Sequence, residues 1–165
     1  MTEQVNHPKH YNQHPAGIEC IEIIRHYTCD ISNALKYLWR AGLKPEMGKE
    51  DAEKEIEDLK KALWYVEDYL SSTSNRHSAE ANPETMDYYV WDTTGHTITE
   101  VITGYHSDVS QAIFKLLQIG LVVNGIVFNA YGWPKMLDEC KLSIRQRILE
   151  LEENHRPIEP ILKHM

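Results

Sequence analysis

The sequence lacks the signatures of the common nucleotide-processing and hydrolytic enzymes. It contains no G-x-x-x-x-G-K-[ST] loop, no G-x-G-x-x-G fingerprint and no H-E-x-x-H motif. Its serines and cysteines stand in no recognisable nucleophile context. These absences exclude a P-loop kinase and leave the chemistry to be found in other residue patterns.

Long hydrophobic runs and paired cysteines are also missing. The most apolar run, 119–128, is far shorter than the ~20 residues that cross a bilayer. The N-terminus has no apolar stretch after a basic start. Three cysteines, an odd number, match no zinc-ligand spacing. We therefore expect reduced thiols, no membrane association and a cytoplasmic location.

Positive charge is scarce. The chain carries 17 Lys and Arg against 25 Asp and Glu, a net charge of −8. A protein of this charge has no general field that attracts nucleic acid, so we expect no nucleic-acid partner. A local cluster of cations can still bind a nucleotide.

The 165 residues predict an α+β fold in two parts. The polar segment 71–86 has almost nothing to bury and is interpreted as a linker. It separates an N-terminal helical domain, 1–70, from a mixed domain, 87–165.

Three helices are expected in the N-terminal domain, after a loop from Asn6 to Gly17 that is rich in histidine. Apolar periodicity predicts helices over 18–28, from Asp30 or Ser32 to Ala41, and from about Lys49 to Leu70.

A ββαβα order is expected in the C-terminal domain. Residues 88–91 and 97–102 have β-type composition. Ser107 is expected to cap a helix that ends at Gly120, and Pro134 to open a long one. Residues 122–128 form either a type I′ hairpin at Asn124-Gly125 or a strand that starts after the glycine.

Two of the predicted helices carry cations beside aromatic rings. Lys36 and Arg40 are one turn apart, with Tyr37 between them, which suits a phosphate and a flat base. The alternative is a solvated basic face. On the next helix, Asp58, Lys61 and Tyr65 admit the same two interpretations, a ligand site or a salt-bridged surface.

Histidines and carboxylates offer further candidates. His7 and His10 lie close together in the N-terminal loop, where imidazoles bind phosphate, ligate metal or move protons. His96, His106, His155 and His164 are scattered, with no partner that the sequence identifies. Four carboxylates could hold Mg²⁺ between helices, or simply form solvated faces: Glu19, Glu22, Glu55 and Asp58.

Taken together, the patterns resemble a family of small phage and prophage domains that are often labelled nucleotide kinases. The matching phrases are His7-Pro-Lys-His10-Tyr11, Gly17-Ile-Glu-Cys-Ile21, Asn33 to Lys44, and Asp58 to Tyr65. They cover about residues 5–70. The resemblance implies a phage-encoded protein acting on nucleoside phosphates in the host cytoplasm, and it adds Tyr11, Asn33 and Lys44 to the candidate nucleotide-binding residues.

The first hypothesis is a nucleotide-binding protein that acts as a nucleoside monophosphate kinase, with ATP as donor and Mg²⁺ as cofactor. Phosphates would contact Lys36, Arg40, Lys44 and Lys61. His7 or His10 would act at the transferred group, Asp58 would hold Mg²⁺ or ribose, and Tyr37 or Tyr65 would stack on the base.

Two alternatives stay open. The same groups suit a binder without turnover that sequesters a nucleotide-derived defence signal of the host. A fainter similarity to the all-helical nucleoside-triphosphate pyrophosphatases assigns the four carboxylates to Mg²⁺, although Lys61 lies close to them. The long apolar seam of the third helix favours a homo-oligomer.

Overall fold

The structure, a computed structural model, describes residues 8–43, 50–72 and 77–155. The chain forms an α+β protein, mostly helical, with a small mixed sheet. The helices are α2 (Lys9–Asn12), α3 (Cys20–Ile24), α4 (Cys29–Arg40), α5 (Asp51–Ser71), α6 (Pro83–Thr94), α7 (Ile98–Val101), α8 (Ser107–Leu116) and α9 (Trp133–Asn154). The strands are β1 (Ala79–Ala81), β2 (Ile119–Val123) and β3 (Ile126–Ala130).

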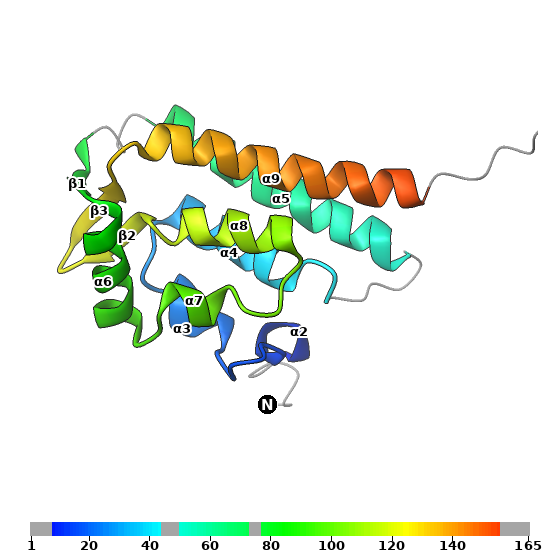
Figure 1. The fold of residues 1–165 in the computed structure, drawn as a ribbon, viewed down its shortest axis with the longest axis horizontal. Helices are drawn as coiled ribbons and strands as arrows, with labels where there is room; N and C mark the ends of the chain where they lie inside the picture. Colours follow the sequence, from blue (N-terminus) through cyan, green and yellow to red (C-terminus); the bar gives the residue numbers. More distant parts are fainter. Residues whose placement is uncertain (1–7, 44–49, 73–76, 156–165) are drawn as a thin grey trace, which may run out of the picture.

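Two long helices, α5 and α9, pack side by side along the length of the molecule (Figure 1). Helix α4 packs against α5, and α8 packs against α9. The hydrophobic core between these helices draws on both parts of the chain, from Ile18 to Leu151. No helix among the described residues is long and apolar enough to cross a membrane.

The sheet has the strand order β1-β3-β2, with β1 parallel and β2 antiparallel to β3. Asn124 and Gly125 join β2 to β3 with φ angles of 50° and 78°. Positive φ at both central residues is what a type I′ turn requires. Of the two possibilities for 122–128, the hairpin is the one that forms.

The hairpin is fastened to the helices through Gly120 and Asn129. The Asn129 Oδ1 atom accepts hydrogen bonds from the Tyr69 hydroxyl at 2.7 Å and from the Gly120 N–H at 2.8 Å. The Thr28 N–H donates to the Gly120 carbonyl at 2.8 Å, just before α4 begins. Gly120 has a φ of +68°, and a β-carbon there would lie 2.7 Å from Ile31 Cγ1. This close contact sets the position of α4 against the sheet.

The prediction of strands at 88–91 and 97–102 is wrong, because helices α6 and α7 occupy these positions. The Asn82 side chain caps α6, Pro83 is its first residue, and Gly95 ends it in the left-handed conformation. Thr97 and Glu100 form a capping box on α7. These end signals outweigh the β propensity of the aromatic and β-branched residues between them.

Other predicted boundaries also move. The helix expected over 18–28 covers only Cys20–Ile24, because the chain at Tyr27 forms a bridge with Leu121 of β2. The loop from Asn6 to Gly17 contains the short helix α2. The segment interpreted as a linker contains β1 and the start of α6.

The amphipathic helices are confirmed more closely. Helices α4 and α5 begin and end within a few residues of the predicted positions, and α9 begins at Trp133, next to the Pro134 that was expected to open it. Ser107, which was expected to cap a helix ending at Gly120, is instead the first residue of α8; the capping side chain is that of His106, and the helix ends at Leu116.

His14 anchors the N-terminal segment to the rest of the molecule. It is buried, and its Nε2 lies 2.7 Å from the Val101 carbonyl oxygen while its Nδ1 accepts the Ala16 N–H. Its ring lies against Trp39, with 5.0 Å between ring centroids. Since Nδ1 is an acceptor, the ring donates its proton from Nε2 to Val101. The segment that carries Tyr11 is thereby held against α4.

Two carboxyl groups meet where α4 begins and α5 ends. Burial, the negative charge of Asp68 and a hydrogen bond with Asp68 together raise the pKa of Asp30 to about 6. Two like charges in contact disfavour ionisation of the more buried one. The contact between Asp30 and Asp68 therefore stabilises the folded protein more at low pH, where Asp30 is protonated, than at neutral pH.

We expect Gly120→Ala to destabilise the protein by about 3 kcal/mol, because the new methyl group would overlap Thr28 and Ile31 and the positive φ would be strained. Gly95→Ala is the matched control: its φ is similar at +79°, but nothing lies within 4 Å of its β-carbon. It should cost only about 1 kcal/mol. Urea unfolding measures both, and equal losses would contradict the close packing at Gly120.

We expect Asp30→Asn to raise the melting temperature at pH 7. The folded-state pKa of Asp30 is raised, so its stabilising contribution is complete below the unfolded value near 3.8 and is lost as the pH rises through about 6. The advantage of the variant should therefore shrink as the pH falls from 7 to 4. Thermal melts across this range give the measurement, and a constant difference would contradict the carboxyl pairing.

Candidate functional site

Arg40, in the last turn of α4, joins three segments of the chain. Its Nε and Nη2 donate to Asp58 Oδ1 of α5 at 3.2 and 3.0 Å. Its Nη1 donates to the Tyr11 hydroxyl at 3.2 Å. Burial opposes the charge of the guanidinium, but the bonds to Tyr11 and Asp58 outweigh it and raise the pKa of Arg40. Three of the four phrases that carry the family resemblance thus meet at one side chain.

Asp58 is fully buried and lies between two cations. Besides Arg40, the Lys54 Nζ lies 3.6 Å from its Oδ1. Its Oδ2 accepts no hydrogen bond in the described structure. A carboxylate enclosed in this way balances the charge of its neighbours, and it presents no exposed oxygen to a metal ion or a ribose.

Tyr37 is surrounded by cations on the exposed side of the same helices. Its ring centroid lies 4.5 Å from Arg40 Cζ, 4.8 Å from Lys36 Nζ and 5.6 Å from Lys61 Nζ. The Tyr65 ring stacks on Tyr37 with 5.9 Å between centroids and 13° between planes. We call these five residues the Tyr37 cluster: Lys36, Tyr37, Arg40, Lys61 and Tyr65.

The cluster has an excess of positive charge. Six ionisable side chains are linked by these contacts: Lys36, Arg40, Lys54, Glu57, Asp58 and Lys61. Four are cations and two are carboxylates; three of the cations and neither carboxylate belong to the Tyr37 cluster, in a chain whose net charge is −8. The Lys61 side chain is 42% exposed. A small anion can therefore reach a local positive surface that the composition of the chain conceals.

Asn33 holds the Lys36 amine in place. Lys36 Nζ donates to Asn33 Oδ1 at 3.1 Å, while Asn33 Nδ2 donates back to the Cys29 carbonyl at 2.9 Å. The bond orients the lysine and leaves its positive charge uncompensated by any carboxylate in the described contacts. Asn33 is therefore a positioning residue for the cluster.

A cavity of about 240 Å³ adjoins the cluster between α2, α3 and α4. Its lining residues are Pro8, Tyr11, Asn12, Glu19, Cys20, Ile21, Ile24 and Lys36. Burial raises the pKa of the Cys20 thiol to about 12, so this wall carries an uncharged thiol rather than a thiolate. Lys36 belongs both to the cavity and to the Tyr37 cluster, so one ligand can contact the two.

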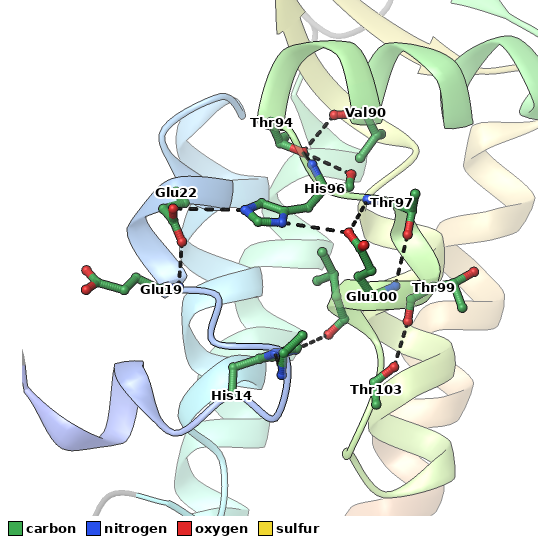
Figure 2. Close-up of polar contacts among 12 residues, drawn as sticks. His14, Glu19, Glu22, Val90, Thr94, His96, Thr97, Thr99, Glu100 and Thr103 are labelled. Atoms are coloured by element: carbon green, nitrogen blue, oxygen red, sulfur yellow. Dashed lines mark hydrogen bonds and ion pairs between the residues drawn. The ribbon is translucent and has the colours of Figure 1, made fainter.

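The four carboxylates proposed for Mg²⁺ do not form one group. Glu22 accepts the Glu19 N–H at 2.7 Å and lies 3.9 Å from His96 of the α6–α7 loop (Figure 2). Glu55 pairs with Arg147 of α9 at 2.9 Å, and Asp58 pairs with Arg40. Within the described ranges, the close-set groups of three or more His, Cys, Asp or Glu include none of the four.

Three other predicted residues are not placed. His7 and Lys44 lie outside the described residues, and His10 is described by its backbone alone. The structure adds two residues that the sequence reasoning passed over, Lys54 and Glu57. Their spacing was the available signal, since Lys54 is one turn from Asp58 and Glu57 is one turn from Lys61.

Fold and cluster together define a small α+β protein in which a buried ion pair lies beneath a half-buried group of cations and tyrosines. Residues 5–67 match the model of a family described as a protein of unknown function, DUF3310. The matched segment contains the Tyr37 cluster, Asp58 and every residue that lines the adjoining cavity. No curated protein and no solved structure matches the chain.

We expect Arg40→Ala to destabilise the protein by about 3–5 kcal/mol, because it leaves Asp58 buried with Lys54 as its remaining cation. Lys61→Ala removes an exposed cation of the same cluster and should cost less than about 1 kcal/mol. Chemical unfolding of both variants makes the comparison. Similar small losses would show that the Arg40–Asp58 pair does not hold the helices together.

Proposed function

We propose that the protein binds a nucleotide or a nucleotide-derived small molecule at the Tyr37 cluster and the adjoining cavity. The observation that carries this proposal is the placement of Lys36, which lines an apolar cavity and also lies 4.8 Å from the Tyr37 ring among two further cations. A ligand with a flat ring and a phosphate needs an apolar wall next to a positive surface.

Phosphate would contact the half-buried cations, Lys36 and Lys61, whose ammonium groups carry three donors each. Arg40 lies behind them and adds its charge, while its hydrogen bonds are committed to Tyr11 and Asp58. The base would enter the cavity against Ile21 and Ile24, since one face of Tyr37 is already covered by Tyr65.

The arrangement supports binding more strongly than catalysis. Phosphoryl transfer commonly relies on a metal ion held by carboxylates near the transferred group. Asp58 is enclosed by Arg40 and Lys54, and Glu55 is paired with Arg147. We therefore favour a protein that sequesters its ligand, such as a phage protein that removes a nucleotide-derived signal from the host cytoplasm.

A nucleoside monophosphate kinase is the second candidate. The same cluster would hold the acceptor phosphate, and His7 or His10 would act at the transferred group with ATP and Mg²⁺ supplied. A pyrophosphatase has less support, because Glu22, Glu55 and Asp58 would have to leave the partners described above.

Lys36→Gln and Lys61→Gln test the site. Each should weaken binding of a nucleoside phosphate about tenfold, because each removes a charge-assisted contact worth about 1.5 kcal/mol. The matched control is Lys60→Gln, which alters a lysine that neighbours Lys61 in sequence but faces Glu152 and lies outside the cluster. Calorimetric titration of a nucleotide panel, with and without Mg²⁺, gives the affinities.

The same incubations, analysed by chromatography, separate the two candidates. Tight binding that survives removal of Mg²⁺, with no new nucleotide formed, supports sequestration. A new diphosphate appearing together with ADP would establish the kinase. If Lys36→Gln and Lys61→Gln bind as well as Lys60→Gln, the site assignment is wrong.

A further inference from the structure

A second group of titratable side chains lies where α8 packs against α9. His106 immediately precedes α8, Asp108 is in its first turn, and Glu150 is near the end of α9. Helices α8 and α9 run in opposite directions against each other, so the start of α8 lies beside the later half of α9 (Figure 1). One ligand atom from each of the three residues can be chosen so that all lie within 4.8 Å of one another.

We propose that this group is a binding site for a divalent transition-metal ion. His106 Nε2 and Glu150 Oε2 are 3.2 Å apart. Two neighbouring ligands on a metal ion, each about 2.1 Å from it, are separated by about 3.0–3.4 Å. The imidazole and carboxylate thus already stand at the spacing that a shared ion requires.

Binding an ion would change the tautomer of His106. Its Nδ1 accepts the Asp108 N–H at 3.2 Å, so the proton of the neutral ring is on Nε2, facing Glu150. Binding of an ion at Nε2 requires the proton on Nδ1 instead, which ends the hydrogen bond from the Asp108 N–H and turns Nδ1 into a donor that faces the Asp108 carboxylate, 3.8 Å away. A carboxylate on the second ring nitrogen is the usual means of orienting a metal-bound histidine.

The surroundings favour a cation. His106 lines a cavity of about 270 Å³ together with Glu55 and Arg147. Asp108 and Glu150 do not line this cavity, but their carboxylate oxygens lie 3.8 and 3.2 Å from the ring nitrogens of His106, and Arg147 pairs with both Glu55 and Glu150. Among these described residues three carboxylates lie near one guanidinium, and the cavity leaves room for water molecules as further ligands.

Arg147 shares Glu150 with the site. Its Nη1 donates to Glu150 Oε2, the oxygen that faces His106, at 3.1 Å, and its Nε donates to Glu55 at 2.9 Å. A carboxylate has several acceptor positions, so Glu150 can keep this hydrogen bond while it binds an ion. Hydrogen-bonded carboxylates are common among metal ligands. One imidazole with carboxylate and water suits Mn²⁺ or Zn²⁺ better than the all-oxygen coordination that Mg²⁺ prefers.

The test is a titration of the full chain, freed of metal by a chelator, with Mn²⁺ alone. Free Mn²⁺ is measured by electron paramagnetic resonance. His106→Asn removes the imidazole and retains a good helix cap, and Glu150→Gln removes the carboxylate charge. Glu139→Gln is the matched control, since Glu139 is also on α9 but pairs with Lys115 of α8.

We expect the native chain and Glu139→Gln to bind one Mn²⁺ with equal affinity, and His106→Asn and Glu150→Gln to bind it at least about tenfold more weakly. Circular dichroism confirms that each variant is folded. No binding by the native chain at millimolar Mn²⁺, or equal binding by all four proteins, overturns the proposal. The titration contains no nucleotide, so neither result bears on the proposed function.

Discussion

The buried pair of Arg40 and Asp58 is the contact on which the candidate site depends. A charge that is removed from water without a partner is strongly destabilising, so α4 and α5 must pack in the register that brings these two side chains together. The Tyr11 hydroxyl adds the N-terminal segment to the same guanidinium. Tyr37, one turn before Arg40, and Lys61, one turn after Asp58, are placed as a consequence.

This arrangement divides the charged residues by burial. Arg40 and Lys54 are buried on either side of Asp58, and Lys54 also pairs with Glu57, while Lys36 and Lys61 are only half-buried and remain within reach of a ligand. The buried charges keep the exposed ones close together despite their mutual repulsion. An acidic chain can in this way present a small positive surface, which its net charge of −8 does not suggest.

Prediction from sequence succeeded where the structural signal is local. The spacing of apolar residues located α4, α5 and α9, and Asn124-Gly125 indicated the hairpin turn. It failed at 88–91, where aromatic and β-branched residues suggested a strand. There the Asn82 cap, the following proline and the Gly95 terminus select a helix, on which Met86 and Val90 are buried. Caps at both ends carried more information than the residues between them.

The sequence by itself determined which residues share a helical face, because the period of a helix depends only on neighbouring residues. It therefore placed Lys36 with Arg40, and Asp58 with Lys61. Only the tertiary structure decided which faces meet. It brought Arg40 to Asp58, separated Glu55 from Glu19 and Glu22 by pairing it with Arg147, and set His106 against Glu150. Contacts between distant segments depend on how whole helices pack, and spacing along one helix does not encode that.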